Sequence, residues 1–314
     1  MITGRQATCL PWQPDDAVFA RVEALARTHR EAVYDILHAL VAAWHPTFRE
    51  HASNEFGKMV ELSTKMTLVG HACAEVVGIT FEPRHQRIAA LYGGCCFLAD
   101  SFIDNFGEAA TREYLQRFTD LFASGWFEIR NERERLFYIL AARLFAERDV
   151  LDPMVRQAIL KLHAAQELDA LLRIEPSRIA GLTEAQRRAL LKRVARDRGG
   201  HTIILLTVLL VPDLPIALLA GLFSAGSLFM YIDDHGDCFT DRRDGRVTYM
   251  NQMRDPERTL HRIVTAHFLY VLARLPRNAG RDVLLGILAR YYFTRIDKHR
   301  TQRSRGGTAW DVYE

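Results

Sequence analysis

Cysteines are scarce in this sequence, and their spacing excludes a covalently braced fold. Only five of the 314 residues are cysteines, an odd number that includes the adjacent pair Cys95 and Cys96. No CxxC pair occurs, so the sequence predicts neither a disulfide framework nor a zinc site. Free thiols are typical of a reducing compartment, and we therefore expect a cytoplasmic protein.

The N-terminus lacks the apolar run that a signal peptide needs. Its first residues, MITGRQATCLPWQPDD, are mostly polar, so we expect no signal peptide. The one long apolar stretch, LPIALLAGLFSAGSLFMYI at residues 214–232, is nominally long enough to span a membrane. It is rich in small residues and runs directly into Asp233 and Asp234. This favours a buried central helix in a protein that is not an integral membrane protein.

A large excess of one charge is also missing, since the net charge is only +3. This value is too small to indicate a nucleic-acid partner, and we expect none. The basic residues near the C-terminus lack the interleaved aromatic side chains of a nucleic-acid surface. They are Arg295, Lys298, His299, Arg300, Arg303 and Arg305. We interpret them as a mobile basic end that closes over an anion, with residues 301–314 as its tail.

The sequence also lacks the patterns typical of β-strands, and we therefore expect helices to be the main secondary structure. The chain has no hairpin turn between alternating apolar and polar residues. Its ten prolines fall where helices are expected to begin or end. They outline helices at about 15–44, 55–78, 84–107, 110–125, 131–147, 153–173, 183–211, 214–241, 256–275 and 278–300.

Two local patterns refine this helical prediction. Residues 183–186, TEAQ, form a capping box that opens a helix. Gly199 and Gly200 are expected to interrupt the same helix, as at a kink. No repeat or linker is visible, and 49% apolar residues suffice for a sizeable core. We therefore expect one all-α domain, residues 1–314, a bundle of about ten helices with a short N-terminal segment at 1–14.

The sequence does contain two sets of acidic residues at helical spacing, which we call the first and the second carboxylate ladder. The first is Asp100, Asp104 and Glu108, and the second is Asp233, Asp237 and Asp241. On an α-helix, spacing by four residues stacks side chains along one face. Each ladder follows an apolar stretch, LYGGCCFLA or AGLFSAGSLFMYI.

Like charges stacked in this way repel one another, at a cost of about 0.2–0.5 kcal/mol per pair. Mg²⁺ offsets such charge, because it prefers oxygen ligands and bridges carboxylates to substrate phosphates. Two ladders that face each other across a cavity would hold a metal–diphosphate complex above an apolar well. Arg242, Arg243 and Arg246 follow the second ladder and suit bidentate contacts with phosphate oxygens. The alternative for each ladder is a solvated acidic surface.

Residues one or two turns before each ladder are expected to face the same way and to form the walls of this well. On the first helix they are Tyr92, Cys96 and Phe97, and on the second they are Ala225, Phe229 and Met230. An ordinary packed core is the alternative for each of these six residues.

At these residues the sequence resembles the class I isoprenoid synthase superfamily, whose members share a helical bundle and two aspartate-rich motifs. Residues 100–108, DSFIDNFGE, look like the first motif in its DxxxD form. Residues 233–246 are similar to the second motif of bacterial large-terpene synthases of the tetraprenyl-β-curcumene synthase type. The end of this run also looks like the second motif of squalene and phytoene synthases.

The resemblance implies a terpene synthase in which Mg²⁺, three ions in all, serves to ionise a prenyl diphosphate. The resulting carbocation would cyclise in a central apolar cavity of the bundle. Asp100 and Asp104 would hold two ions, and the second ladder would hold the third. The implied diphosphate-binding residues are Arg242, Arg243, Arg246, the pair Arg290 and Tyr291, and one upstream arginine among Arg187, Arg188, Arg193 and Arg196. The oligomeric state is left open, a homodimer included.

One departure from a related family bears on the number of substrates. Chain-elongating prenyltransferases have a Gly-Lys-x-x-Arg site for isopentenyl diphosphate, whereas this chain has Gly57-Lys58-Met-Val-Glu61. A second diphosphate site is therefore poorly supported, which favours a reaction of a single substrate. The alternative enzyme is a prenyl-chain transferase, including one that joins two chains head to head. The alternative without catalysis is a helical scaffold or lipid-binding protein.

Overall fold

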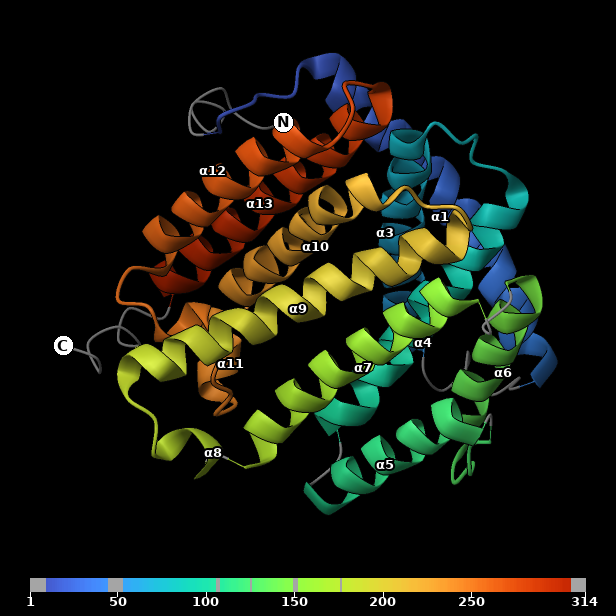
Figure 1. Ribbon diagram of the computed structural model, residues 1–314, viewed down its shortest axis with the longest axis horizontal. Coiled ribbons are helices and arrows are strands. Elements are labelled where there is room, and N and C mark those ends of the chain that lie inside the picture. Colours follow the sequence, from blue (N-terminus) through green and yellow to red (C-terminus); the bar gives the residue numbers. More distant parts are fainter. Residues whose placement is uncertain are drawn as a thin grey trace. The chain divides into compact units, whose positions relative to one another are not determined.

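The computed structural model describes residues 10–44, 53–105, 108–124, 126–148, 152–175 and 177–305. Within these ranges every regular element is a helix and none is a strand (Figure 1). The elements are α1 (Asp16–Trp44), α3 (Ser53–Val77), α4 (Pro83–Asn105), α5 (Glu108–Ser124), α6 (Glu132–Glu147), α7 (Pro153–Ile174), α8 (Ser177–Ala180), α9 (Glu184–Leu210), α10 (Ile216–Gly236), α11 (Cys238–Arg243), the 3₁₀ turn η2 (Met250–Gln252), α12 (Pro256–Arg274) and α13 (Ala279–Arg305). The predicted all-α helical bundle is confirmed.

Most helix boundaries lie close to those predicted, because short-range chemistry sets them. Pro83, Pro153 and Pro256 occupy the first helical position, where the N–H that proline lacks would have no partner inside the helix. The predicted capping box of α9 is confirmed. The backbone N–H of Thr183 donates to Oε1 of Gln186 over 3.0 Å, and the N–H of Gln186 donates to Oγ1 of Thr183 over 3.3 Å.

The expected interruption at Gly199 and Gly200 is wrong, since α9 runs unbroken from Glu184 to Leu210. The two glycines instead allow a close approach to α10. A Cβ on Gly199 would lie 2.3 Å from the backbone oxygen of Gly226, and one on Gly200 would lie 2.3 Å from the ring of Phe223. Their lack of a side chain serves helix packing and not a turn.

The boundaries at the C-terminal side of both α10 and α13 differ from the prediction. The expected helix 214–241 is two helices, because α10 ends at Gly236 and α11 begins at Cys238. In contrast, α13 is longer than expected and reaches Arg305, since no glycine or proline occurs from Ile287 to that point. The predicted tail therefore begins inside a helix, and its remaining residues, 306–314, lie outside the described part.

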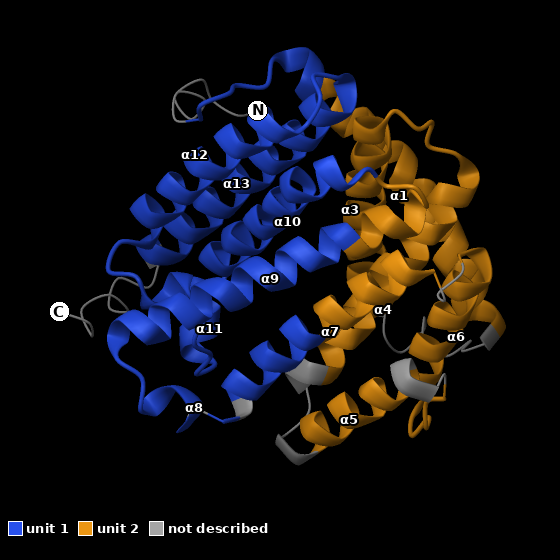
Figure 2. Cartoon of the chain, viewed as in Figure 1, with its two compact units in different colours: residues 1–19, 164–204, 215–314 blue, residues 20–163, 205–214 orange. Residues whose placement is uncertain are grey.

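The helices group into two compact units (Figure 2). Unit 1 consists of residues 1–19, 164–204 and 215–314, and unit 2 of residues 20–163 and 205–214. Three of the four borders between the units fall inside the continuous helices α1, α7 and α9, and the fourth falls in the short segment between α9 and α10. The division thus follows no long linker, while the extent of the domain over residues 1–314 stays a prediction.

Unit 2 is built around α4, which packs against α3 and α6. A Cβ on Gly93 would lie 2.4 Å from Cα of Ser63 in α3, and one on Gly94 would lie 2.9 Å from Cδ1 of Leu140 in α6. The glycine pair therefore allows α4 to lie tightly between two neighbours. Asp100 lies near the C-terminal end of this central helix.

Unit 1 is built around α10, which packs against α12 and α13. Of the described helices, α10 is also the one with the length and apolar composition to cross a membrane. Half of its apolar window is buried in the structure, and Leu222, Ala225 and Leu228 are fully covered. Since the central helix of a globular bundle has the same composition, the expectation that the protein is not in a membrane stays a prediction.

Candidate functional site

The second carboxylate ladder keeps its helical register across the junction between α10 and α11. The N–H of Asp237 donates to the backbone oxygen of Asp233 over 3.0 Å, and the N–H of Asp241 donates to that of Asp237 over 2.8 Å. The three aspartates therefore follow one another by single turns, although Asp237 itself lies between the two helices. The ladder therefore keeps its spacing of one turn although the helix is interrupted at Asp237.

Like charge accumulates along this ladder. Asp241 is buried, and burial together with the charges of Asp237 and Asp233 raises its pKa to about 6. Arg173 and Arg246 oppose this increase. Asp234 is also buried, and burial raises its pKa well above the usual value against the charge of Arg198. The ladder is thus a place where additional positive charge would be stabilising.

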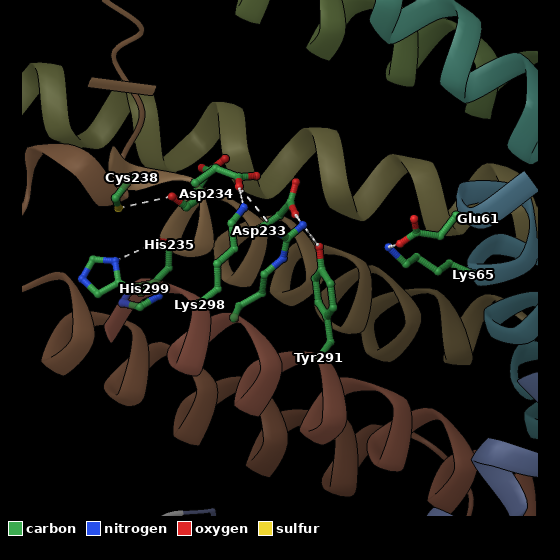
Figure 3. A network of polar contacts seen from close by, with 11 residues as sticks. Glu61, Lys65, Asp233, Asp234, His235, Cys238, Tyr291, Lys298 and His299 are labelled. Atoms are coloured by element: carbon green, nitrogen blue, oxygen red, sulfur yellow. Dashed lines mark hydrogen bonds and ion pairs between the residues drawn. The ribbon is translucent and has the colours of Figure 1, made fainter. Parts of the chain in front are cut away.

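Residues of α13 contact the first two carboxylates of the ladder (Figure 3). The hydroxyl of Tyr291 donates to Oδ1 of Asp233, and Arg295 forms an ion pair with the same oxygen. Nη1 of Arg295 also lies 3.4 Å from Oδ1 of Asp237, and Lys298 forms an ion pair with that oxygen. The three α13 residues share one face, because they are spaced by four and three residues.

Two features hold Arg295 in this position. Its Nη2 donates to the hydroxyl of Tyr291 over 2.8 Å, and its guanidinium carbon lies 5.0 Å from the centre of the tyrosine ring. The absence of a side chain at Gly236 makes room for it, since a Cβ there would lie 2.5 Å from Cδ of Arg295. The glycine within the second motif therefore has a steric role.

A second group of arginines lies around Asp169 on α7, also in unit 1. Asp169 is 2.7 Å from Nη2 of Arg173 and 3.0 Å from Nη1 of Arg198. Burial opposes its ionisation, but the charges of Arg173, Arg198 and Arg246 outweigh burial and lower the pKa of Asp169. Because Arg173 and Arg246 act on both Asp169 and Asp241, these arginines and the ladder form one electrostatic cluster, and Arg198 acts on the neighbouring Asp234.

The predicted diphosphate-binding residues differ in where they lie. Tyr291 contacts the ladder, and the charge of Arg246 acts on Asp241. Three other predicted arginines make local contacts. Arg242 donates to the backbone oxygen of Asn251 over 2.6 Å, Arg243 to Asp244 over 3.0 Å and Arg196 to Asp197 over 2.9 Å. Arg290, the sequence neighbour of Tyr291, is exposed.

Sequence reasoning did not assign Arg295, Lys298 or Arg198 to the ladder. The sequence predicts that Arg295 and Lys298 belong to a mobile basic end, whereas they lie within α13. The signal that could have found them is their spacing from Tyr291 on a helix that no glycine interrupts after Gly286. Arg198 gave no such signal, because its partner Asp169 is distant in the sequence.

The first ladder is shorter than predicted. Asp100 and Asp104 both lie on α4, but α4 ends at Asn105 and Glu108 opens α5. The expectation of three acids along one helix is therefore wrong. The side chain of Asp104 lies outside the described part of the structure.

The residues predicted as the wall before Asp100 lie on its side of α4. Tyr92 is buried and forms a side-chain hydrogen bond with Cys96. Burial and the charge of Asp100 raise the pKa of Cys96 to about 12. Phe97 is half-buried. Cys96 is a neutral thiol at ordinary pH and belongs to an apolar surface beneath the carboxylate.

The predicted wall on α10 begins directly below the second ladder. Phe229 is half-buried, and its ring lies 6.0 Å from that of Tyr291 between centroids. Met230 is half-buried, and Ala225 is fully buried. The assignment of these residues to a hydrocarbon cavity stays a prediction, as does the arrangement of the two ladders across it, because the ladders belong to different units.

Mg²⁺ fits the donor chemistry of these residues. Within the described ranges no three His, Cys, Asp or Glu side chains are gathered into a metal-binding group. The candidate donors are nevertheless all carboxylate oxygens, the ligands that Mg²⁺ prefers. Arg295 and Lys298 stand beside two of them in the manner of counter-ions.

Comparison of the chain with protein-family models, with curated proteins and with solved structures finds no match in any of the three. The function is therefore inferred from the residues and the geometry of the site.

Proposed function

We propose that the protein is a class I terpene synthase, which ionises a prenyl diphosphate with the aid of Mg²⁺, cyclises the carbocation and releases diphosphate. One observation carries the proposal. Three carboxylates at successive turns run from the end of the apolar helix α10 into α11, and cationic side chains of α13 lie against the first two of them. Carboxylates that would hold Mg²⁺ and basic side chains suit a ligand with a polyanionic head, and the apolar helix suits its hydrocarbon tail.

The carboxylates provide the metal ligands in this proposal. Asp100 and Asp104 would hold two Mg²⁺ ions, and Asp233, Asp237 and Asp241 would hold the third. When bound, the metal supplies Lewis-acid neutralisation of the leaving diphosphate. The proposed reaction needs no protein nucleophile, because its first chemical step is the departure of diphosphate.

Cationic side chains of unit 1 bind the diphosphate oxygens. Arg295 and Lys298 reach the ladder from α13, and Arg246 acts on it from the segment after α11. Arg198 is the best-placed upstream arginine, since its charge acts on Asp234 within the motif.

Aromatic side chains below the ladder stabilise the carbocation and exclude water from it. Phe229 and Tyr291 lie against each other in this position. A cation over an aromatic ring gains about 2 kcal/mol where water is excluded. On α4, Tyr92 and Phe97 are proposed to have the same role.

A single substrate is favoured over the alternative of a prenyl-chain transferase. At the position where such enzymes have an arginine for a second diphosphate, this chain has Glu61. Oε1 of Glu61 lies 2.7 Å from Nζ of Lys65 one turn along α3 (Figure 3). Both side chains are about half exposed or more. An acid paired locally on a helix surface repels a second diphosphate and does not bind it.

The test is incubation with Mg²⁺ and prenyl diphosphates from C10 to C35, each alone and in pairs, followed by hydrocarbon analysis and assay of released diphosphate. A cyclic product from one prenyl diphosphate alone supports the proposal. A product formed only from two prenyl diphosphates identifies a transferase instead. Failure of Mg²⁺ with inorganic diphosphate to raise the Tm would favour a scaffold, since a ligand of the folded state must stabilise it.

A further inference from the structure

The second ladder already has cationic partners from its own chain. Arg295 is paired with both Asp233 and Asp237, and Lys298 is paired with Asp237. All of these contacts are made to one oxygen, Oδ1, of each carboxylate. Positive charge therefore stands where the proposed function requires a metal ion.

The two cations are held with different strength. Arg295 is largely buried, stacks on Tyr291 and fits against Gly236. Lys298 is about one-third exposed and has a long flexible stem. An ion pair of that exposure contributes little stability. Lys298 is therefore the cation that a competing charge displaces more easily.

We propose that Arg295 and Lys298 are resident counter-cations of the second ladder, which metal displaces and which then bind the diphosphate that arrives with it. The inference rests on the proposed function and adds a mechanism of coupling to it. Metal alone binds this ladder weakly, because it must compete with both side chains. Metal and diphosphate together bind tightly, because the displaced cations gain an anionic partner.

This exchange couples the two ligands without a separate regulatory site. The factor by which diphosphate raises the affinity for metal must equal the factor by which metal raises the affinity for diphosphate, since the coupling free energy is reciprocal. Removal of a resident cation should therefore have opposite effects on the two ligands measured singly. Affinity for metal alone should rise, and affinity for diphosphate should fall.

The variants are Lys298→Gln and Arg295→Gln, with Arg300→Gln as the matched control. Arg300 lies on the same helix and is paired with Glu257 of α12, so its removal changes the net charge equally but not the ladder's partners. Folding is checked by circular dichroism and Tm. Binding of Mn²⁺ alone is measured by electron paramagnetic resonance, and binding of inorganic diphosphate with and without Mg²⁺ by calorimetry.

We expect Lys298→Gln and Arg295→Gln each to bind Mn²⁺ roughly 5- to 10-fold more tightly than the parent and the control. The gain in diphosphate affinity caused by Mg²⁺ should shrink by a similar factor. If both variants bind Mn²⁺ as the parent does while Mg²⁺ still promotes diphosphate binding, the exchange is wrong and the proposed function stands. If the binding changes appear but no prenyl diphosphate is turned over, the exchange stands and the proposed function is wrong. An absence of metal binding in every variant overturns both.

Discussion

The hydroxyl of Tyr291 on α13 donates a hydrogen bond to Oδ1 of Asp233 on α10, a residue 58 positions earlier in the chain. The same hydroxyl accepts a hydrogen bond from Arg295. Tyr291 thus connects a carboxylate to a guanidinium that is itself paired with that carboxylate. This three-residue contact positions the last described helix against the second ladder.

Replacement of Tyr291 by phenylalanine should lower the free energy of unfolding by about 1.5–3 kcal/mol, because a hydrogen bond to a charged group is lost while the ring remains. Urea unfolding of the metal-free protein measures the change. Tyr270→Phe is the control, since its ring is on the exposed side of α12. Equal stability of parent and Tyr291→Phe would mean that the hydrogen bond contributes nothing to folding.

Asp104→Asn and Asp237→Asn should each lower turnover by orders of magnitude and leave the helix content unchanged. The amide keeps the shape of the side chain but loses the charge that Mg²⁺ requires. Steady-state assays at limiting Mg²⁺ give the comparison, with Asp213→Asn in the exposed turn before α10 as the control. Product formation near the parental rate in both variants would remove the central claim.

Stability should depend on pH through a histidine pair in unit 2, of which His29 is buried. Nε2 of His29 lies 2.9 Å from Nδ1 of His71, and Nδ1 of His29 lies 3.2 Å from Nε2 of Gln86. Burial and the charge of His71 lower the pKa of His29 to about 4. As the pH falls below about 6.5, the unfolded chain takes up this proton first.

The free energy of unfolding should therefore decrease between about pH 6.5 and pH 4, with His29 contributing about 3 kcal/mol at most. Urea unfolding at a series of pH values gives the slope. His29→Gln should remove part of that slope, whereas His38→Gln, elsewhere on α1, should preserve it. An identical slope in parent and His29→Gln would exclude His29 as a source of acid sensitivity.

Ala225→Phe and Cys96→Phe should each restrict the proposed hydrocarbon cavity. Shorter substrates or prematurely quenched products are expected. Added bulk in a packed wall costs about 1–3 kcal/mol, and the loss should be larger for Ala225, which is fully buried, than for half-buried Cys96. If both folded variants keep the parental substrate range and products, these residues line the core and not a cavity.

Gly199→Ala should destabilise the protein by about 1–3 kcal/mol through overpacking, because its Cβ would lie 2.3 Å from the backbone oxygen of Gly226. Gly57→Ala is the matched control within a helix, since nothing lies within 4 Å of the position of its Cβ. That substitution should stabilise by about 0.5–1 kcal/mol. Thermal unfolding of the two variants should thus shift in opposite directions.

The helices could be predicted from the sequence because the signals that bound them are local. Pro83 and Pro256 open helices through their own backbone geometry, and the capping box at Thr183 needs only three further residues. The register of the second ladder is local for the same reason. Gly199 was misinterpreted, since a glycine that breaks a helix and one that allows close packing look alike until the neighbouring helix is known.

The partners of the ladder could not be predicted, because they depend on contacts between distant segments. Lys298 lies 61 positions after Asp237, and Arg198 on α9 pairs with Asp169 on α7, with the helix α8 between them in the sequence. The three arginines directly after the ladder were the natural local candidates. Arg242 instead contacts the backbone of Asn251 in η2, and Arg243 contacts the side chain of the adjacent Asp244.

The distance along the chain between the ladder and its partners also sets an order of events during synthesis. Asp233 is translated 58 residues before Tyr291, and Lys298 follows Asp237 by 61 residues. At about 5–20 residues per second, the interval is roughly 3–12 seconds. During that time Asp233 and Asp237 have no α13 beside them, whereas Arg173 and Arg246, whose charges act on Asp241, are already in the chain or follow within a few residues. Arg295 and Lys298 are therefore the last of these cations to reach the ladder.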